Sequence, residues 1–96
     1  MIYAEIENND SYYDFYPELL AYIKKCFQDV ESGLQGDAWI WIKCNNEKVA
    51  LDTFTSMRFQ IKTDIKNGAL VKEVIDTLKK RYSVHVFDEP EPEAHE

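Results

Sequence analysis

The chain has 96 residues, a formal net charge of −7 at pH 7, 45% hydrophobic residues and 14% aromatic residues. This size and composition predict one small domain with a hydrophobic core, which excludes intrinsic disorder for most of the chain. The chain holds only three glycines, two cysteines and two histidines, which excludes a glycine-rich phosphate loop, a disulfide framework and a paired-histidine zinc motif.

The charge is distributed unevenly along the chain. Residues 1–37 carry −6, residues 38–87 carry +4 and residues 88–96 carry −5. Such asymmetry concerns partners and solubility rather than the fold. No apolar run has the length of a membrane span, and the first residues lack the basic and apolar regions of a signal peptide. We therefore expect a cytoplasmic protein without membrane contact.

The first predicted element is a strand over residues 1–7. In this segment Ile2, Ala4 and Ile6 alternate with Tyr3 and two glutamates, so the isoleucines face one side and Tyr3 faces the other. The acids on the outer side predict a position toward an edge of a sheet or beside a basic strand.

A turn cluster at residues 8–11 leads into an amphipathic helix that begins somewhere within residues 12–17. Its apolar stripe continues at three- and four-residue spacings over residues 19–30. Gly33 is expected to end the helix as a left-handed C-cap. Residues 32–37 then form a loop that connects the helix to the next strand.

Residues 38–63 predict three antiparallel strands in a row, around which the rest of the chain packs. The side chains alternate between apolar residues that face the core and residues that face outward. Asn45 and Asn46 separate the first two strands and tolerate the left-handed backbone that a tight hairpin requires. A two-residue turn would place Ile42 opposite Val49, so both would share the core face.

The outward face of these three strands is both aromatic and basic. The third strand, over residues 57–62, shows the clearest alternation of the three. The full outward set is Trp39, Trp41, Lys43, Lys48, Ala50, Asp52, Phe54, Arg58, Gln60 and Lys62. Tryptophan is usually buried and lysine stems often cover aromatic rings, so this face is either covered or partly open for binding.

The C-terminal part of the chain predicts a helix, a strand and a tail. Asp64 or Asn67 is the candidate cap of the helix, and residues 83–87 form the last strand. Residues 89–96 form a flexible acidic tail outside a single domain of residues 1–88. The apolar stripe of the second helix comprises Leu70, Val71, Val74, Ile75 and Leu78.

The predicted order of elements is β-α-β-β-β-α-β. Two helices packed on one face of a mostly antiparallel sheet would bury every apolar stripe of the chain, which defines an α+β fold. Such a two-layer arrangement does not by itself indicate a function.

The sequence offers little support for catalysis. Cys26 falls on the apolar stripe of the first helix and Cys44 at the inward end of a strand, so we expect two buried and unreactive thiols. His85 is expected on the last strand without a second ligand at helical spacing. We therefore expect no metal and no cofactor, and a small enzyme remains only a second alternative.

The start of the first helix is a candidate binding surface, which we name the helix entrance (residues 12–18). Tyr12, Tyr13, Asp14 and Glu18 combine tyrosines with acids, and the four aromatic residues of this segment cannot all face the core. Tyrosines supply interface contacts, and acids speed encounter with a basic partner. We expect a protein-binding module, such as an inhibitor, an immunity-type protein or an adaptor, that binds a basic protein.

The aromatic and basic sheet face suggests two alternatives. Trp39 and Trp41 lie on one side of a strand, where they could stack on the bases of a single-stranded nucleic acid while lysines meet phosphates. The net negative charge of the chain opposes this interpretation. The same tryptophans could instead form a homodimer interface.

Overall fold

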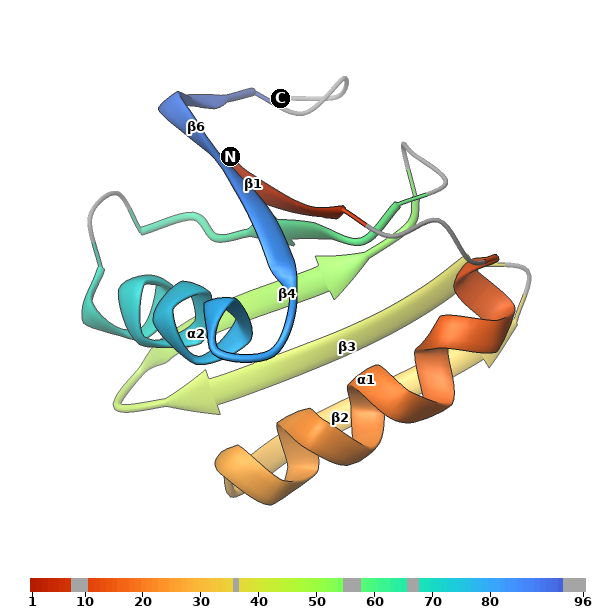
Figure 1. The fold of residues 1–96 in the computed structure, drawn as a ribbon. Coiled ribbons are helices and arrows are strands. Elements are labelled where there is room, and N and C mark those ends of the chain that lie inside the picture. The colour runs from red at the N-terminus through yellow and green to blue at the C-terminus, as the bar shows by residue number, and fades with distance from the viewer. Residues whose placement is uncertain (8–10, 36, 55–57, 66–67, 93–96) are drawn as a thin grey trace.

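The computed structural model describes residues 1–7, 11–35, 37–54, 58–65 and 68–92 (Figure 1). The predicted turn at residues 8–10, the turn near residues 55–57 and the end of the predicted tail at residues 93–96 lie outside these described residues. The elements of the described chain are β1 (Ile2–Glu7), α1 (Tyr12–Cys26), β2 (Asp29–Gln35), β3 (Asp37–Cys44), β4 (Glu47–Asp52), β5 (Gln60–Lys62), α2 (Ala69–Lys79) and β6 (Ser83–Glu91).

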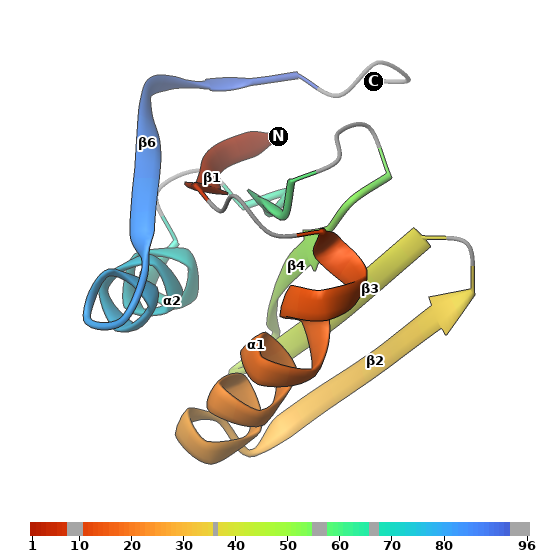
Figure 2. The ribbon, with the colours of Figure 1, turned by 45° about the vertical axis from the view of Figure 1, so that its right-hand side comes forward.

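The fold is the predicted α+β class, with two helices on one face of an antiparallel sheet (Figures 1 and 2). The six described strands lie in the order β2-β3-β4-β5-β1-β6, and each neighbouring pair is antiparallel. α1 packs against β2 and β3, whereas α2 packs against β4, β5 and β6. We name the covered side the helix face and the other side the open face.

The hydrophobic core lies between the helix face and the two helices. The predicted hairpin is confirmed: Asn45 and Asn46 both have positive φ angles, of 50° and 67°, and Ile42 pairs with Val49. Two consecutive left-handed residues form the turn that matches the twist of the flanking strands. The alternating residues of β3 and β4 that face the helices, including Ile40, are fully buried.

The first helix is shorter than predicted. α1 ends at Cys26, and the extended Phe27 donates its N–H to the carbonyl of Ile23. The predicted continuation to Val30, the C-cap at Gly33 and the loop over residues 32–37 are therefore wrong, because this segment forms β2 and pairs along its whole length with β3. The apolar residues at the start of the β2 segment fit the spacing of a helix and the alternation of a strand equally well.

The alternation predicted for β1 is interrupted by a bulge. The register with both neighbouring strands shifts between Ile2 and Ala4, because an extra residue in one strand turns the next side chain. Tyr3 is therefore buried in the core and does not face outward. β1 lies one strand from the edge of the sheet, beside β5 and the edge strand β6.

Both cysteines are exposed, which corrects the expectation of buried thiols. Cys26 is the last residue of α1, where the helix leaves the core. Cys44 is the last residue of β3 and pairs with Glu47 across the hairpin turn. In each case the residue follows the apolar pattern, but the buried part of the element ends before it.

The start of α2 is capped by another element. The N-cap position is Gly68, which makes no side-chain cap hydrogen bond, so Asp64 is not the cap; Asn67 lies outside the described residues. The carboxylate of Glu47 in β4 instead accepts a hydrogen bond of 3.3 Å from the N–H of Leu70. An acid at this end also complements the helix dipole. After α2, strand β6 continues to Glu91, beyond its predicted end at residue 87.

A cluster of aromatic residues joins α1 to the end of α2. The ring of Tyr82 contacts Phe15 and Tyr22 edge to face, with centroid distances of 5.1 and 5.7 Å. The hydroxyl of Tyr22 donates a hydrogen bond of 2.8 Å to the carbonyl of Thr77. Burial raises the pKa of Tyr82 above its ordinary value. These contacts fix the side of α1 that faces α2.

Candidate functional site

Two tryptophans form an aromatic pair on the open face. Trp39 and Trp41 project from β3 on the side opposite its buried residues, and their ring centroids lie 4.5 Å apart at an angle of 40°. The ammonium of Lys48 in β4 lies 3.8 Å from the ring centroid of Trp41. Both indoles are half-buried by their neighbours, so the pair forms a partly exposed aromatic surface.

The position of Trp39 depends on a glycine in the neighbouring strand. Gly33 in β2 pairs with Trp39, and the indole lies over the glycine backbone. A Cβ atom at residue 33 would stand 2.5 Å from the indole ring. Gly33 therefore provides the space into which Trp39 leans toward the outer edge of the sheet.

Replacing Gly33 with alanine is expected to displace the indole of Trp39. The new methyl group overlaps the ring, and overpacking of this kind costs about 1 to 3 kcal/mol of stability. A red-shifted tryptophan emission and stronger acrylamide quenching would report the displaced ring. Ser32→Ala is the control, since this neighbour projects from the other side of β2. Unchanged emission in Gly33→Ala would show that Trp39 does not rest on Gly33.

Three cations of the open face have carboxylate partners, each from a different strand. Lys43 pairs with Glu31 of β2 at 3.1 Å, and Arg58 pairs with Glu5 of β1 at 3.5 Å. Both of these ion pairs are partly exposed, so each contributes little to stability.

The third ion pair of this face is buried. Lys62 of β5 and Asp52 of β4 approach to 2.7 Å, and each side chain is only 4% exposed. Asp52 also accepts a hydrogen bond of 3.3 Å from the N–H of Phe54. A buried ion pair is costly to break because one charge then remains in a poorly solvated place. Lys62 and Gln60 therefore project from the predicted side of the sheet, and both side chains are buried there.

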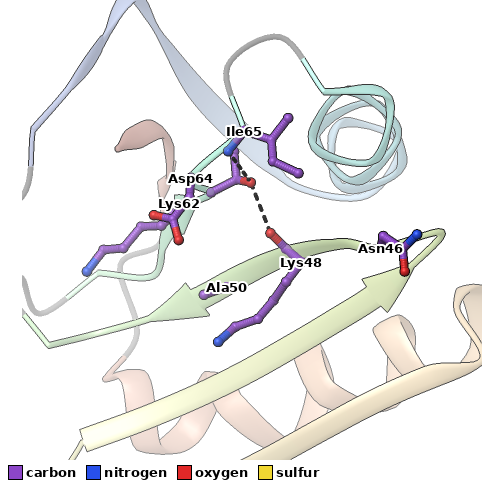
Figure 3. Close-up of a pocket in the computed structure, with 7 residues that line it drawn as sticks. Asn46, Lys48, Ala50, Lys62, Asp64 and Ile65 are labelled. Atoms are coloured by element: carbon purple, nitrogen blue, oxygen red, sulfur yellow. Dashed lines mark hydrogen bonds between the residues drawn. The ribbon is translucent and has the colours of Figure 1, made fainter.

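A shallow pocket of about 300 Å³ adjoins Lys48 between β4 and the segment after β5 (Figure 3). The hydroxyl of Thr63, one of the lining residues, donates a hydrogen bond of 2.9 Å to the carbonyl of Lys48. The lysine side chains of residues 48 and 62 extend away from Asn46 at the far end of the pocket (Figure 3). The pocket widens the surface beside Trp41.

The helix entrance contributes fewer surface groups than its composition indicates. Tyr13, 49% exposed, and Asp14 lie at the surface, which confirms that at least one aromatic residue of this segment faces outward. Phe15 and Tyr16 are buried, and Glu18 pairs with Arg81 at 3.3 Å. The side chain of Tyr12 lies outside the described part of the structure. Binding at this surface stays a prediction.

The structure does not bring the two predicted binding regions together. Trp39 and Trp41 lie on the open face, whereas the helix entrance belongs to α1 on the helix face (Figure 2). The sequence interpretation missed Glu31 and Gly33, because it placed both in a helix end and a loop. Only the alternation of Val30, Ser32 and Leu34 could have revealed their strand.

No group of three or more His, Cys, Asp or Glu residues that could hold a metal ion occurs among the described residues. None of the helices in the described ranges has the length and apolar character needed to cross a membrane. The chain matches no protein-family model, no curated protein sequence and no solved structure. The assignment of a function therefore rests on the surfaces of the chain itself.

Proposed function

We propose that this chain is a non-enzymatic protein-binding module, and that the open face around Trp39, Trp41 and Phe54 binds a basic protein. The observation that carries the proposal is the pair of tryptophan rings in contact on the sheet face that neither helix covers. Tryptophan is enriched among the residues that dominate the free energy of protein association. Phe54 adds an apolar side chain that is 51% exposed.

The charges of the open face favour a protein partner over a nucleic acid. Lys43, Arg58 and Lys62 each pair with a carboxylate of the same face. Nucleic-acid affinity comes mainly from cations that replace the counterions of phosphates, and paired cations must first give up their partners. A protein interface typically has an aromatic-rich centre and a polar rim. The aromatic rings of the open face and the paired charges around them fit that arrangement.

The net charge of the whole chain favours a basic partner. A molecule of charge −7 attracts basic proteins over a range of about 8 Å at physiological salt and repels acidic ones. Asp14 at the exposed helix entrance adds to this field. We infer that the acids speed the encounter while the aromatic residues hold the complex.

The test compares two apolar side chains of equal exposure on different faces. Phe54 is 51% exposed on the open face and Tyr13 is 49% exposed at the helix entrance. Proteins captured from native extract by the wild type are identified by mass spectrometry, purified and measured against variants by surface plasmon resonance. Phe54→Ala and Trp41→Ala are expected to raise the dissociation constant at least about tenfold, mainly by faster dissociation.

Tyr13→Ala is the matched control and is expected to leave the dissociation constant nearly unchanged. A loss with Tyr13→Ala but not with Phe54→Ala would move the binding surface to the helix entrance. A fluorescein-labelled single-stranded oligothymidylate tests the alternative ligand. Quenching of tryptophan emission at 0.15 M salt with a dissociation constant below about 100 µM, in the range of ordinary non-specific binding, would overturn the choice of a protein partner.

A further inference from the structure

β2 is a strand at the edge of the sheet that carries two acids, Asp29 and Glu31, but has no lysine, proline or bulge to block pairing. In the described part of the chain its only strand neighbour is β3, so the backbone groups on its other side face outward. Natural edge strands are commonly blocked by lysine, proline or a bulge. β2 contains none of the three: its sequence is DVESGLQ, its register with β3 is continuous, and Leu34 is 40% exposed.

α1 places a second exposed layer above this edge. Glu18 contacts Arg81 and Tyr22 contacts Thr77, so this side of α1 faces α2. Residues 13, 20 and 24 lie on the opposite side of the helix, at spacings of seven and four. Figures 1 and 2 show α1 running along β2, with its first turn at the end of β2 that carries Leu34. The exposed Tyr13 thus belongs to the same edge of the molecule.

We propose that the chain forms a homodimer in which β2 pairs antiparallel with β2 of a second copy, with the two-fold axis at Ser32. In this register Val30 lies opposite Leu34 of the second copy, and Glu31 lies opposite Gly33. The acidic first half of β2 therefore meets the uncharged second half, and no like charges stand directly opposite each other. The strand is self-complementary, as an isologous interface requires.

The two α1 helices fit the same symmetry. The two-fold axis brings the α1 helices of both copies side by side in opposite directions. The side of α1 that faces the second copy carries Tyr13 near its start and Lys24 in its last turn, whereas Asp14 lies four residues before Glu18, on the side toward α2. Opposite helix directions place the positive end of each dipole beside the negative end of its neighbour. The antiparallel dipoles and the self-complementary register of β2 select a second copy of this chain as the occupant of the edge.

The dimer would join both sheets into one continuous sheet. Because the two-fold axis is perpendicular to the sheet, the two open faces lie on the same side and present both tryptophan pairs together. The dimer does not depend on the proposed protein partner, since the purified chain alone should form it. If that partner exists, the dimer offers it two equivalent sites.

The register is tested by disulfide trapping in a background of Cys26→Ser and Cys44→Ser. Directly opposed residues of an antiparallel pair have Cα atoms about 4.5 to 5.5 Å apart, within the range of a disulfide. Ser32→Cys is therefore expected to form a covalent dimer in a glutathione redox buffer. Oxidised glutathione takes up the two electrons and two protons that leave the two thiols as the S–S bond forms.

Val30→Cys is the register control. Its Cα atom lies about 13 Å or more from the same position of the second copy, so it should not cross-link with itself. A mixture of Val30→Cys and Leu34→Cys should cross-link as a heterodimer. Cross-linking of Ser32→Cys no faster than that of Val30→Cys would overturn the proposed pairing.

Sedimentation equilibrium tests the dimer without any cysteine. The wild type is expected to be dimeric at micromolar concentrations, and Leu34→Lys is expected to raise the dimer dissociation constant at least about tenfold by placing a cation opposite the apolar Val30 of the second copy. Ile65→Lys is the matched control, because Ile65 is also 40% exposed but lies beyond β5. A monomeric wild type at about 100 µM would overturn the proposal. Since no partner is added, this result is independent of binding at the open face.

Discussion

Asp52→Asn is expected to lower the free energy of unfolding by about 3 to 5 kcal/mol, because it leaves the ammonium of Lys62 without its buried counter-charge. The two side chains are 2.7 Å apart and only 4% exposed. Asparagine retains the size of the side chain and an oxygen that can accept from Phe54, so the change isolates the lost charge. Urea denaturation followed by tryptophan emission measures the effect.

Two further variants separate burial from the mere presence of an ion pair. Glu31→Gln breaks the pair with Lys43, whose side chains are 40% and 52% exposed, and should cost less than about 1 kcal/mol. The double variant Asp52→Asn with Lys62→Met should be more stable than Asp52→Asn alone, since it removes the orphaned charge. Equal costs for the buried and the exposed pair would show that water reaches Lys62.

The parts of the fold that the sequence predicts correctly depend on local patterns. The alternation in β3 and β4 and the two asparagines between them predict the hairpin, its register and the shared side of Trp39 and Trp41. The stripe of α2 likewise predicts which of its residues are buried. Each of these features needs only neighbours within a few residues, because side-chain periodicity repeats at 2.0 or 3.6 residues.

The edge strand could not be predicted because its first residues fit two periodicities. Phe27 and Val30 continue the helical stripe of α1, and Gly33 follows them at a position typical of a helix C-cap. The pairing with β3 decides the outcome, and it depends on tertiary contacts. The register of β2 brings Gly33 beneath Trp39 and Glu31 beside Lys43.

The local charge balance of the candidate site could not be predicted from the order of charges along the sequence. Residues 38–87 carry +4 and suggest a basic face. In the structure Glu5 from β1 and Glu31 from β2 lie beside Arg58 and Lys43, so acids from the N-terminal third pair with two of the cations of the middle block. These contacts therefore favour the proposed protein partner over the nucleic acid that the block charges suggest.

Phe59→Ala is expected to cost about 3 to 5 kcal/mol, the second large effect that the structure implies. Phe59 is fully buried where the sheet meets α1. Its ring stacks on Tyr16 with a centroid distance of 6.2 Å and meets Phe15 edge to face at 6.1 Å. Removing it leaves a cavity beneath the helix entrance that the neighbouring rings cannot fill. Urea denaturation measures the loss, and Phe59→Leu offers a milder change if the alanine variant does not fold.

Phe54→Ala is the matched control five residues earlier in the chain. Its ring is 51% exposed, so its removal should change the free energy of unfolding by less than about 1 kcal/mol. This contrast would show that the two phenylalanines have different roles. Phe59 packs against Phe15 and Tyr16 of the helix entrance in the core, whereas Phe54 is exposed on the open face. A comparable loss from Phe54→Ala would show that its ring stabilises the sheet, and the open face would then lose its most exposed candidate contact.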